Sequence, residues 1–230
     1  MTPELLKLLR GIDTPTVCNA IETVQGKRGF DAFTRGTMLC SDPGHSVVGY
    51  AVTAQIAALA PPTEPAEVIR ARRMDYYRAM YDAPKPSVAV IEDLDFPDCI
   101  GAYWGEVNTT IHKGFGMSGA LTNGVMRDLG DLPDGFPVIA GSIGPSHGFV
   151  HVRSIGAPVT IFGLHVAQGD LIHADRHGAV VIPADVVDSL ARGIEKLLSA
   201  EHELIYEALA PDLEFEAFER AWAAFERART

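Results

Sequence analysis

The sequence has few cysteines, and their placement excludes a disulfide-bonded scaffold. Its three cysteines, Cys18, Cys40 and Cys99, lie far apart in the chain, are odd in number and form no CxxC pair. A disulfide framework or a zinc site would require an even set or a paired spacing. The sequence therefore predicts reduced thiols and a cytoplasmic protein.

The sequence also has no basic run. Its 19 Lys and Arg residues stand against 30 Asp and Glu residues, which gives a formal net charge of −11. Nucleic acids and anionic membranes are bound mainly through Lys and Arg, so both are poor partners for this chain. An acidic protein can still bind a small anion in one locally basic pocket.

No segment reads as a membrane span or a signal peptide. The longest apolar run, residues 47–60, is too short and too polar to cross a bilayer. The first 22 residues carry charges inside their apolar stretch and contain no cleavage-site pattern, which predicts that no signal peptide is present.

Common catalytic signatures are absent or misplaced. There is no GxSxG elbow. "GFGMSG" (114–119) matches GxGxxG, but a helix is expected before it and a strand after it, the reverse of a dinucleotide-binding unit. A helix end and a tight turn explain it better. Lys113 looks exposed beside glycines, which disfavours a Schiff-base role.

The eight histidines offer a weak alternative. His147 and His151 are four residues apart, and so are His173 and His177. Neither pair lies on a convincing helix, where this spacing would bring two metal ligands together. Polar residues of strands and turns are the favoured interpretation, and a histidine-based metal site remains the alternative.

The 230 residues, 47% of them apolar, suit one large domain with helical additions. We expect helices at 3–11 and 14–24, with Thr14 as N-cap of the second. Further expected elements, in chain order, are a strand at 47–59, a helix within 60–83, a strand at 87–93, a helix between 103 and 116, and strands at 119–128 and 136–142.

The region 157–183 decides between fold classes. It predicts consecutive strands, "APVTIFGLHV", "DLIHADR" and "GAVVIP", with no room for crossover helices. A (β/α)8 barrel needs a helix after every strand, so this region excludes it. The order of elements favours an α/β fold, either an α/β/α or an α+β sandwich around a mixed sheet.

The C-terminal part predicts two helices. The first begins near Ala184 and is broken by Pro211. The second carries an aromatic stripe formed by four residues, Phe215, Phe218, Trp222 and Phe225. Such a stripe is more often a packing surface, for example against a neighbouring subunit, than a cofactor site. We expect a main domain over 1–210 and a C-terminal helical extension over 211–230.

The best candidate for a catalytic site is "NGVMRDLGDL" (123–132), where Arg127 and Asp128 follow an expected buried strand. Upstream, "WGEVN" (104–108) opens a helix, whose free N–H groups bind carboxylates. Arg127 would add a bidentate partner for the same anion. Asp128 and Glu106 are oxygen ligands suited to Mg²⁺ or Mn²⁺. On the residues alone, a structural ion pair is the commoner outcome.

These segments together resemble a known family. "VVGYAVTA", "WGE", "GALTNGVMRD" and "GDLIHADRHGAVVIP" are similar to the RraA-like family, over residues 12–205. That family includes 4-hydroxy-4-methyl-2-oxoglutarate aldolases, often with oxaloacetate decarboxylase activity, and RraA, a regulator of ribonuclease E. The resemblance implies an α/β/α sandwich of the swivelling-domain type, assembled as a homotrimer or hexamer with its active site between subunits.

The resemblance also implies residue roles. Asp128 would bind the metal, Mg²⁺ or Mn²⁺, and Arg127 would hold the keto-acid end of the substrate. Glu106 would take part in the metal site by orienting metal-bound water. The backbone N–H groups of Val107 and Asn108 would bind the substrate carboxylate.

An acid from a neighbouring subunit completes the implied site, and Glu201 and Glu203 are equally good candidates for it. The chain also departs from the family. Asn19 and Asn123 stand where the family often has Asp. Both departures leave the metal-binding residues intact and leave the substrate beyond the pyruvyl group open.

The implied activity is a metal-dependent class II lyase. It would cleave a 4-hydroxy-2-oxo acid to pyruvate and a carbonyl product, and it would decarboxylate oxaloacetate through the same enolate. The alternative is a non-catalytic regulator whose acidic surface binds a basic protein partner such as a ribonuclease, with no need for a metal.

Overall fold

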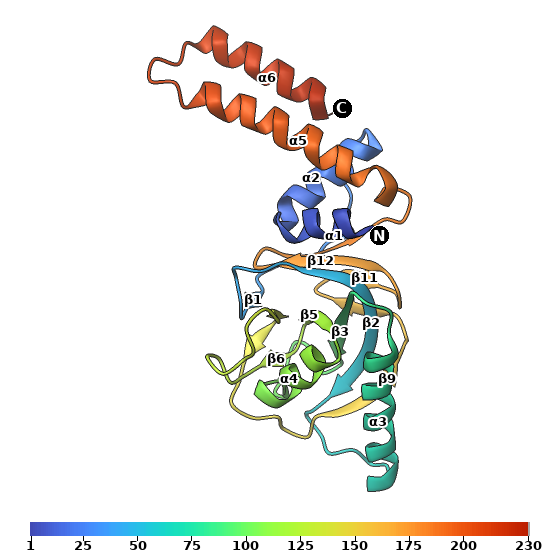
Figure 1. Ribbon diagram of the computed structural model, residues 1–230. Coiled ribbons are helices and arrows are strands. Elements are labelled where there is room, and N and C mark those ends of the chain that lie inside the picture. The colour runs from blue at the N-terminus through green and yellow to red at the C-terminus, as the bar shows by residue number, and fades with distance from the viewer. Residues whose placement is uncertain (230) are drawn as a thin grey trace.

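The computed structural model describes residues 1–229 and has a mixed α/β architecture built on a curled sheet (Figure 1). The helices are α1 (Pro3–Arg10), α2 (Thr14–Gln25), α3 (Ala66–Asp82), α4 (Glu106–Gly114), α5 (Val187–Ala208) and α6 (Phe215–Arg229). The strands are β1 (Leu39–Cys40), β2 (Val47–Ala57), β3 (Ser87–Asp93), β4 (Ala102–Trp104), β5 (Met117–Thr122), β6 (Val125–Met126), β7 (Val138–Ala140), β8 (Ser142–Ile143), β9 (His151–Ile155), β10 (Val159–Ile161), β11 (Leu164–Val166), β12 (Leu171–Asp175) and β13 (Gly178–Ile182).

The main sheet is parallel at its centre and antiparallel at its edges. Its order is β1-β7-β5-β3-β2-β12-β13, and β9 also pairs with β2. The pairs β2–β3, β3–β5 and β5–β7 are parallel, whereas β12 and β9 run antiparallel to β2. The central strand β3 is buried almost throughout, as expected for a parallel strand covered on both faces. The predicted mixed sheet is thereby confirmed.

Helices and a hairpin cover the sheet on different sides. Tyr76 and Met80 of α3 are fully buried with Trp104 in one apolar cluster. Helices α1, α2 and α5 bury a second cluster against β12 and β13. The β10–β11 hairpin closes a third cluster inside the curl of the sheet. These layers agree with the sandwich expected from the order of elements.

The second helix begins differently from the prediction. Asp13, and not Thr14, is the N-cap of α2, and its side chain accepts a hydrogen bond from the Thr16 N–H at 2.9 Å. The Thr14 hydroxyl lies 3.0 Å from His173 Nδ1. Thr14 is therefore used to fasten α2 to β12, a contact across 159 residues that no local pattern indicates.

The segment 119–128 is not one strand, as predicted, but two strands in different sheets. β5 belongs to the main sheet, and β6 lies between β4 and β8 in a small parallel sheet. The break falls at Asn123, whose amide bonds to both backbone groups of Asp93: Oδ1 accepts from the N–H at 2.7 Å and Nδ2 donates to the C=O at 3.1 Å. The side chain of Asn123 thus takes over the pairing that a continuing strand would make.

Two other regions differ in how well the sequence predicts them: one strand is missed and one turn is predicted correctly. Strand β9 was not expected, because its sequence "HVRSI" is short and polar, and it forms only by pairing with the far end of β2. The expected turn at "GFGMSG" is confirmed. α4 ends at Gly114, Gly116 has a φ of +78°, and β5 starts at the next residue.

Helices α5 and α6 form a helical hairpin, here called the arm, which extends beyond α1 and α2 (Figure 1). The aromatic rings predicted as a stripe lie in a row along α6, with successive centroids 5.7 to 5.9 Å apart. Phe225 is buried, while Phe215 and Trp222 are exposed. Within residues 1–229, no helix has the length and apolar character needed to cross a membrane.

Candidate active site

The site forms where two short parallel strands end side by side. β4 pairs with β6, with Trp104 opposite Met126, and the Arg127 N–H continues the pairing by donating to the Trp104 carbonyl at 2.8 Å. Parallel strands end at the same edge, so the start of α4 after β4 meets the residues that follow β6. Segments 22 residues apart in sequence thereby become neighbours.

Asp128 caps α4 from outside the helix. Its Oδ2 accepts a hydrogen bond from the Glu106 N–H at 3.0 Å. Its backbone has a φ of +56°, a left-handed conformation that Asp and Asn tolerate better than most residues. A carboxylate at a helix N-terminus is also favoured by the helix dipole.

Gly105, the N-cap of α4, makes this approach possible. A Cβ at this position would clash with the Asp128 carboxylate and would lie 2.8 Å from Arg127 Nε. Because glycine has no side chain, it also provides no acceptor for the N–H groups of Val107 and Asn108. Those donors are left for another acceptor, such as a bound carboxylate.

Arg127 and Asp128 face each other but leave bonding capacity unused. Arg127 Nε lies 3.6 Å from Asp128 Oδ2, and both side chains are about one-third exposed. Such an ion pair adds little to stability. Within residues 1–229, Arg127 Nε is buried and has no hydrogen-bond partner. A buried donor without a partner is costly in a site that serves only structure.

The donor set at Asp128 fits an Mg²⁺ ion that keeps most of its waters. Oδ2 is used by the Glu106 N–H, and Oδ1 has no hydrogen bond to any described residue. The Glu106 side chain is exposed, and its contact with Asp128 is through the backbone. No group of three His, Cys, Asp or Glu among residues 1–229 could hold a metal. Mg²⁺ is commonly held by one or two carboxylates plus water and does not require a cage of protein ligands. A single carboxylate such as that of Asp128 therefore suits it.

A cavity of about 450 Å³ opens beside this edge. Its lining includes Arg127, Gly105, Val107 and Asn108, so four of the residues at this edge face one space. The opposite wall comes from α3 and from the segment before β9. The structure thus brings the predicted substrate-binding residues together. Glu106 and Asp128 adjoin lining residues in the sequence but do not themselves line the cavity.

A buried network that the sequence did not indicate holds α4 in place. The Tyr77 hydroxyl donates to Asn108 Oδ1 at 3.1 Å, and Asn108 Nδ2 donates to the Tyr103 carbonyl at 3.1 Å. His112 Nδ1 lies 2.7 Å from the Asn108 carbonyl, and its Nε2 lies 2.7 Å from the Tyr76 hydroxyl. These bonds tie the first turn of α4 to α3.

Burial fixes the protonation state in this network. It lowers the pKa of His112 to about 4, so the imidazole is neutral at pH 7. The Asn108 carbonyl can only accept, and therefore His112 Nδ1 carries the proton and Nε2 accepts from Tyr76. Burial likewise raises the pKa of Tyr76, which remains a hydroxyl donor.

The histidine pairs are engaged by the backbone or by polar side chains. His147 Nδ1 lies 2.7 Å from the Gly148 carbonyl, and His151 Nδ1 lies 2.8 Å from the Phe149 carbonyl. Both residues also line the cavity. His173 is buried.

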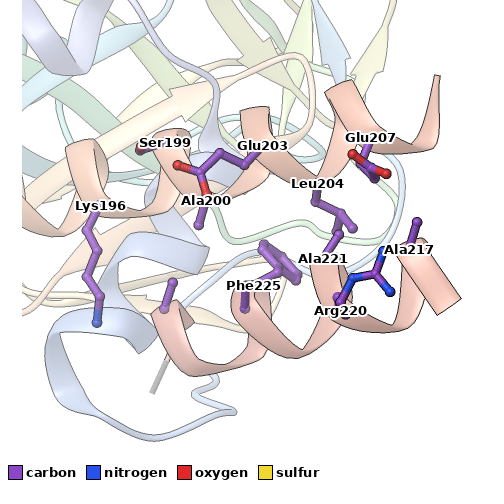
Figure 2. Close-up of a pocket in the computed structure, with 12 residues that line it drawn as sticks. Lys196, Ser199, Ala200, Glu203, Leu204, Glu207, Ala217, Arg220, Ala221 and Phe225 are labelled. Carbon is purple, nitrogen blue, oxygen red and sulfur yellow. The ribbon is translucent and has the colours of Figure 1, made fainter. Parts of the chain in front are cut away.

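Glu201 and Glu203 lie on α5 in the arm, and the α1 and α2 layer separates the arm from α4 and β6 (Figure 1). Glu203 borders a groove between α5 and α6, together with Arg220 and Phe225 (Figure 2). Neither acid reaches the site of its own chain. Whether one of them reaches a neighbouring subunit stays a prediction.

The model of the RraA-like family, described as Aldolase/RraA, matches residues 14–181. A Halalkalibacterium halodurans protein named "Putative 4-hydroxy-4-methyl-2-oxoglutarate aldolase" is 26% identical over 137 residues, which cover 59% of this chain and 64% of that protein. Protein DlpA of Legionella pneumophila is 31% identical over 105 residues, 44% of this chain and 17% of DlpA. The chain thus spans less than two thirds of either relative.

Solved structures agree on the fold. An uncharacterized Pseudomonas syringae protein superposes with a TM-score of 0.70 at 20% identity, covering 97% of this chain and 94% of that one. RraAS2 of Streptomyces coelicolor, described as an unusual member of the RNase ES inhibitor RraA family, superposes with a TM-score of 0.66 at 20% identity. The coverage there is 91% of this chain and 98% of that one. At these identities the likeness shows the fold alone.

Proposed function

The chain belongs to the RraA-like family, and we propose that within this family it is a divalent-metal-dependent lyase that acts on a 4-hydroxy-2-oxo acid. The observation that carries the proposal is the convergence at one cavity edge of three complementary groups. These are the Nε of Arg127, which has no hydrogen-bond partner among residues 1–229, the N–H groups of Val107 and Asn108 at the start of α4, and the carboxylate of Asp128. The resemblance to an aldolase relative supports the same reaction class.

The chain's own residues would bind the pyruvyl end of the substrate. The N–H groups of Val107 and Asn108 would donate hydrogen bonds to the substrate carboxylate at the positive end of α4. The Arg127 guanidinium would donate to the same carboxylate and to the 2-oxo oxygen. Asp128 would hold Mg²⁺ or Mn²⁺, which when bound supplies Lewis-acid polarisation of the 2-oxo acid.

Cleavage needs one proton removed and negative charge stabilised. The exposed carboxylate of Glu106, acting through a water, would take the proton from the C4 hydroxyl. The C3–C4 bond then breaks, the C4 oxygen becomes the carbonyl of one product, and the bonding electrons form the enolate of pyruvate. Arg127 stabilises this enolate more than the ground state, because the charge on the oxygen grows as the bond breaks. Protonation at C3 releases pyruvate.

Oxaloacetate would yield the same enolate by losing CO₂ and would therefore report on this site without knowledge of the natural aldol. The experiment is to incubate the purified protein with oxaloacetate and Mg²⁺, with and without EDTA, and to follow pyruvate in a coupled assay. EDTA-sensitive pyruvate above the metal-only background supports the proposal. The Asp128→Asn variant provides the matched protein control.

A wild-type protein that forms no pyruvate above background, from oxaloacetate or from 4-hydroxy-4-methyl-2-oxoglutarate, would sink the lyase proposal. The regulator alternative would then be tested by pull-down with a basic protein partner such as a ribonuclease. Its support is the acidic balance of the chain and the description of RraAS2 within an inhibitor family.

We also propose that the protein acts as a homotrimer or hexamer. The arm exposes several large apolar side chains for which the single chain offers no cover: Leu198, Ile205, Tyr206, Leu209 and Phe215. Apolar surface of this kind is common at subunit interfaces. Light scattering after size exclusion tests the assembly, and a monomer at micromolar concentration would contradict it.

A further inference from the structure

His147 lies on the loop between β8 and β9, which is fastened to the strand that leads to the active-site edge. The Ala102 N–H, at the start of β4, donates to the Ser146 carbonyl at 2.9 Å. The Val150 N–H closes the turn by donating to the His147 carbonyl at 3.1 Å. Backbone hydrogen bonds therefore set the position of this loop relative to β4.

The loop and the proposed substrate-binding residues lie towards opposite ends of β4. From Ala102, beside the loop, to Gly105, beside Arg127, the chain advances three residues, which is about 10 Å in an extended strand. His147 and Arg127 both line the cavity that runs along this strand. A three-carbon acid bound at Arg127 and an imidazole on the loop can together bridge that distance.

Few of the described residues that line the cavity can exchange a proton near pH 7. Among residues 1–229, no Asp, Glu, Cys or Lys belongs to the lining. Arginines stay protonated, and burial raises the pKa of Tyr77 and of Tyr103, so both tyrosines keep their hydroxyl protons. Two histidines remain, His147 and His151. Imidazole is the side chain best suited to proton transfer at neutral pH.

The surroundings of His151 disfavour it as the proton carrier. The residue is buried, its Nδ1 lies 2.8 Å from the Phe149 carbonyl, and its Nε2 lies 3.4 Å from Arg153 Nη1. Because a carbonyl can only accept, Nδ1 carries the proton of the neutral ring and Nε2 is the acceptor beside the guanidinium. Protonation of Nε2 would place two cations side by side.

His147 has one engaged nitrogen and one free nitrogen. Its Nδ1 lies 2.7 Å from the Gly148 carbonyl, so Nδ1 is the donor. Its Nε2 forms no hydrogen bond with any of residues 1–229, and the residue is exposed, so that water can exchange protons with it. The Nδ1–H bond is kept whether or not Nε2 carries a proton. The ring can therefore bind and release a proton at Nε2 without losing its contact with the backbone.

From these features we propose that His147 is a catalytic residue that transfers a proton between its Nε2 and C3 of the pyruvate enolate. The proposal rests on the proposed function, which forms this enolate at Arg127. The protonated Nε2 gives its proton to C3, the electron pair of the enolate forms the new C–H bond, and the 2-oxo group is restored. The neutral imidazole then takes a proton from water. In the reverse direction, the neutral Nε2 removes a proton from the methyl group of pyruvate.

Exchange of the pyruvate methyl protons in D₂O, followed by proton NMR with Mg²⁺ present, measures this transfer without knowledge of the natural aldol. We expect His147→Gln to slow the exchange about 100-fold, a contribution typical of a general acid or base. Loss of CO₂ from oxaloacetate forms the enolate without a proton transfer, so CO₂ release should stay close to the wild-type rate. A merely structural defect would instead lower both rates together.

Two further variants serve as controls. His165→Gln removes an exposed histidine of β11 that does not line the cavity, and it should exchange pyruvate protons at the wild-type rate. His151→Gln removes the other histidine of the lining and should retain most of the exchange. Loss of exchange in His151→Gln, with exchange retained in His147→Gln, would reverse the assignment and refute the proposal.

The outcomes separate this proposal from the lyase proposal. Loss of exchange in His147→Gln, with CO₂ release retained, supports it. Wild-type exchange in His147→Gln, equal loss of exchange and CO₂ release, or no exchange by the wild-type protein would each overturn it. In these cases, EDTA-sensitive decarboxylation by the wild type would leave the lyase proposal standing alone. A wild type that exchanges pyruvate protons in a His147-dependent manner but cleaves neither substrate would contradict the lyase proposal and not this one.

Discussion

Two regions of the molecule are built on opposite principles: the edge where β4 and β6 end, and the arm formed by α5 and α6. At the edge, Gly105 and Asp128 come from segments that are distant in sequence, and Asp128 has a left-handed backbone. A buried Arg127 nitrogen there has no partner among residues 1–229. In the arm, two consecutive helices pack on each other and leave apolar side chains exposed. Strain and unmet bonding at the edge are features of a site for a ligand, whereas the arm has the features of a surface for another chain.

Substitution of Asp128 tests this comparison most directly. We expect Asp128→Ala to abolish metal-dependent turnover, with a loss of about a thousand-fold or more, because the proposed metal ligand and the outside cap of α4 disappear together. Asp128→Asn keeps the left-handed preference and an acceptor for the Glu106 N–H but loses the charge. It should be nearly as inactive as Asp128→Ala and more stable. Full activity in either variant, with folding checked by circular dichroism, would show that the metal assignment is wrong.

Arg127→Lys separates charge from geometry at the same edge. A lysine keeps the positive charge but cannot reproduce the planar fork of donors. We expect kcat/KM to decrease about 10- to 100-fold, mostly through kcat, because the arginine acts on charge that develops during cleavage. Wild-type kinetics in this variant would instead identify Arg127–Asp128 as a structural ion pair.

Gly105→Ala tests whether the close approach at the edge matters. The added methyl would clash with the Asp128 carboxylate and crowd Arg127 Nε. We expect activity to decrease about tenfold or more while the helix content stays unchanged. Gly114→Ala is the control, because a methyl there meets no atom within 4 Å. Parallel behaviour of the two variants would refute the steric argument.

The two regions should also differ in how much a core substitution lowers the free energy of unfolding. Trp104 is fully buried beside the site, with its ring centroid 4.9 Å from that of His112, and Trp104→Ala should cost about 3–5 kcal/mol of unfolding free energy. Phe225→Ala should cost the main unfolding transition less than about 2 kcal/mol, because α6 can open locally. Urea unfolding with amide exchange along α6 measures both. Equal shifts would mean that arm and body unfold as one unit.

The last expected effect is a gradual change of stability with pH, spread over about two pH units. His112 has a pKa of about 4 in the folded protein and 6.5 as its ordinary value, so between these pH values the unfolded state binds more protons. Its contribution to folding is therefore intact above pH 6.5 and is lost as the pH decreases towards 4, by up to about 3 kcal/mol. His112→Gln should flatten this part of the stability curve. His202→Gln, exposed on α5, should leave the slope unchanged.

Sequence reasoning was most successful where structure depends on neighbouring residues. The apolar run of β3, the alternation in β2, the helix started by Pro3 and the glycines after α4 each predicted an element that the structure contains. The motif around Arg127 and Asp128 also pointed to the correct family. Periodicity and turn chemistry act over a few residues, so a sequence can display them directly.

The failures share one cause. Local rules predict Thr14 as an N-cap, but its hydroxyl contacts His173, 159 residues away. Local rules also predict one strand over 119–128, but the side chain of Asn123 bonds to Asp93, 30 residues away, where the strand breaks. In each case the polar side chain fits a local sequence rule, but in the structure it forms its hydrogen bonds with a residue that is distant in the sequence.

The sequence by itself therefore determined the order of the elements, the acidic character of the chain and the residue types available for chemistry. Only the tertiary structure decided that Asp128 caps α4, that His112 and Asn108 tie α4 to α3, and that Arg73 faces the same cavity as Arg127. The physical reason is that sheet register and helix packing set these distances, and both depend on contacts between segments that no local pattern encodes.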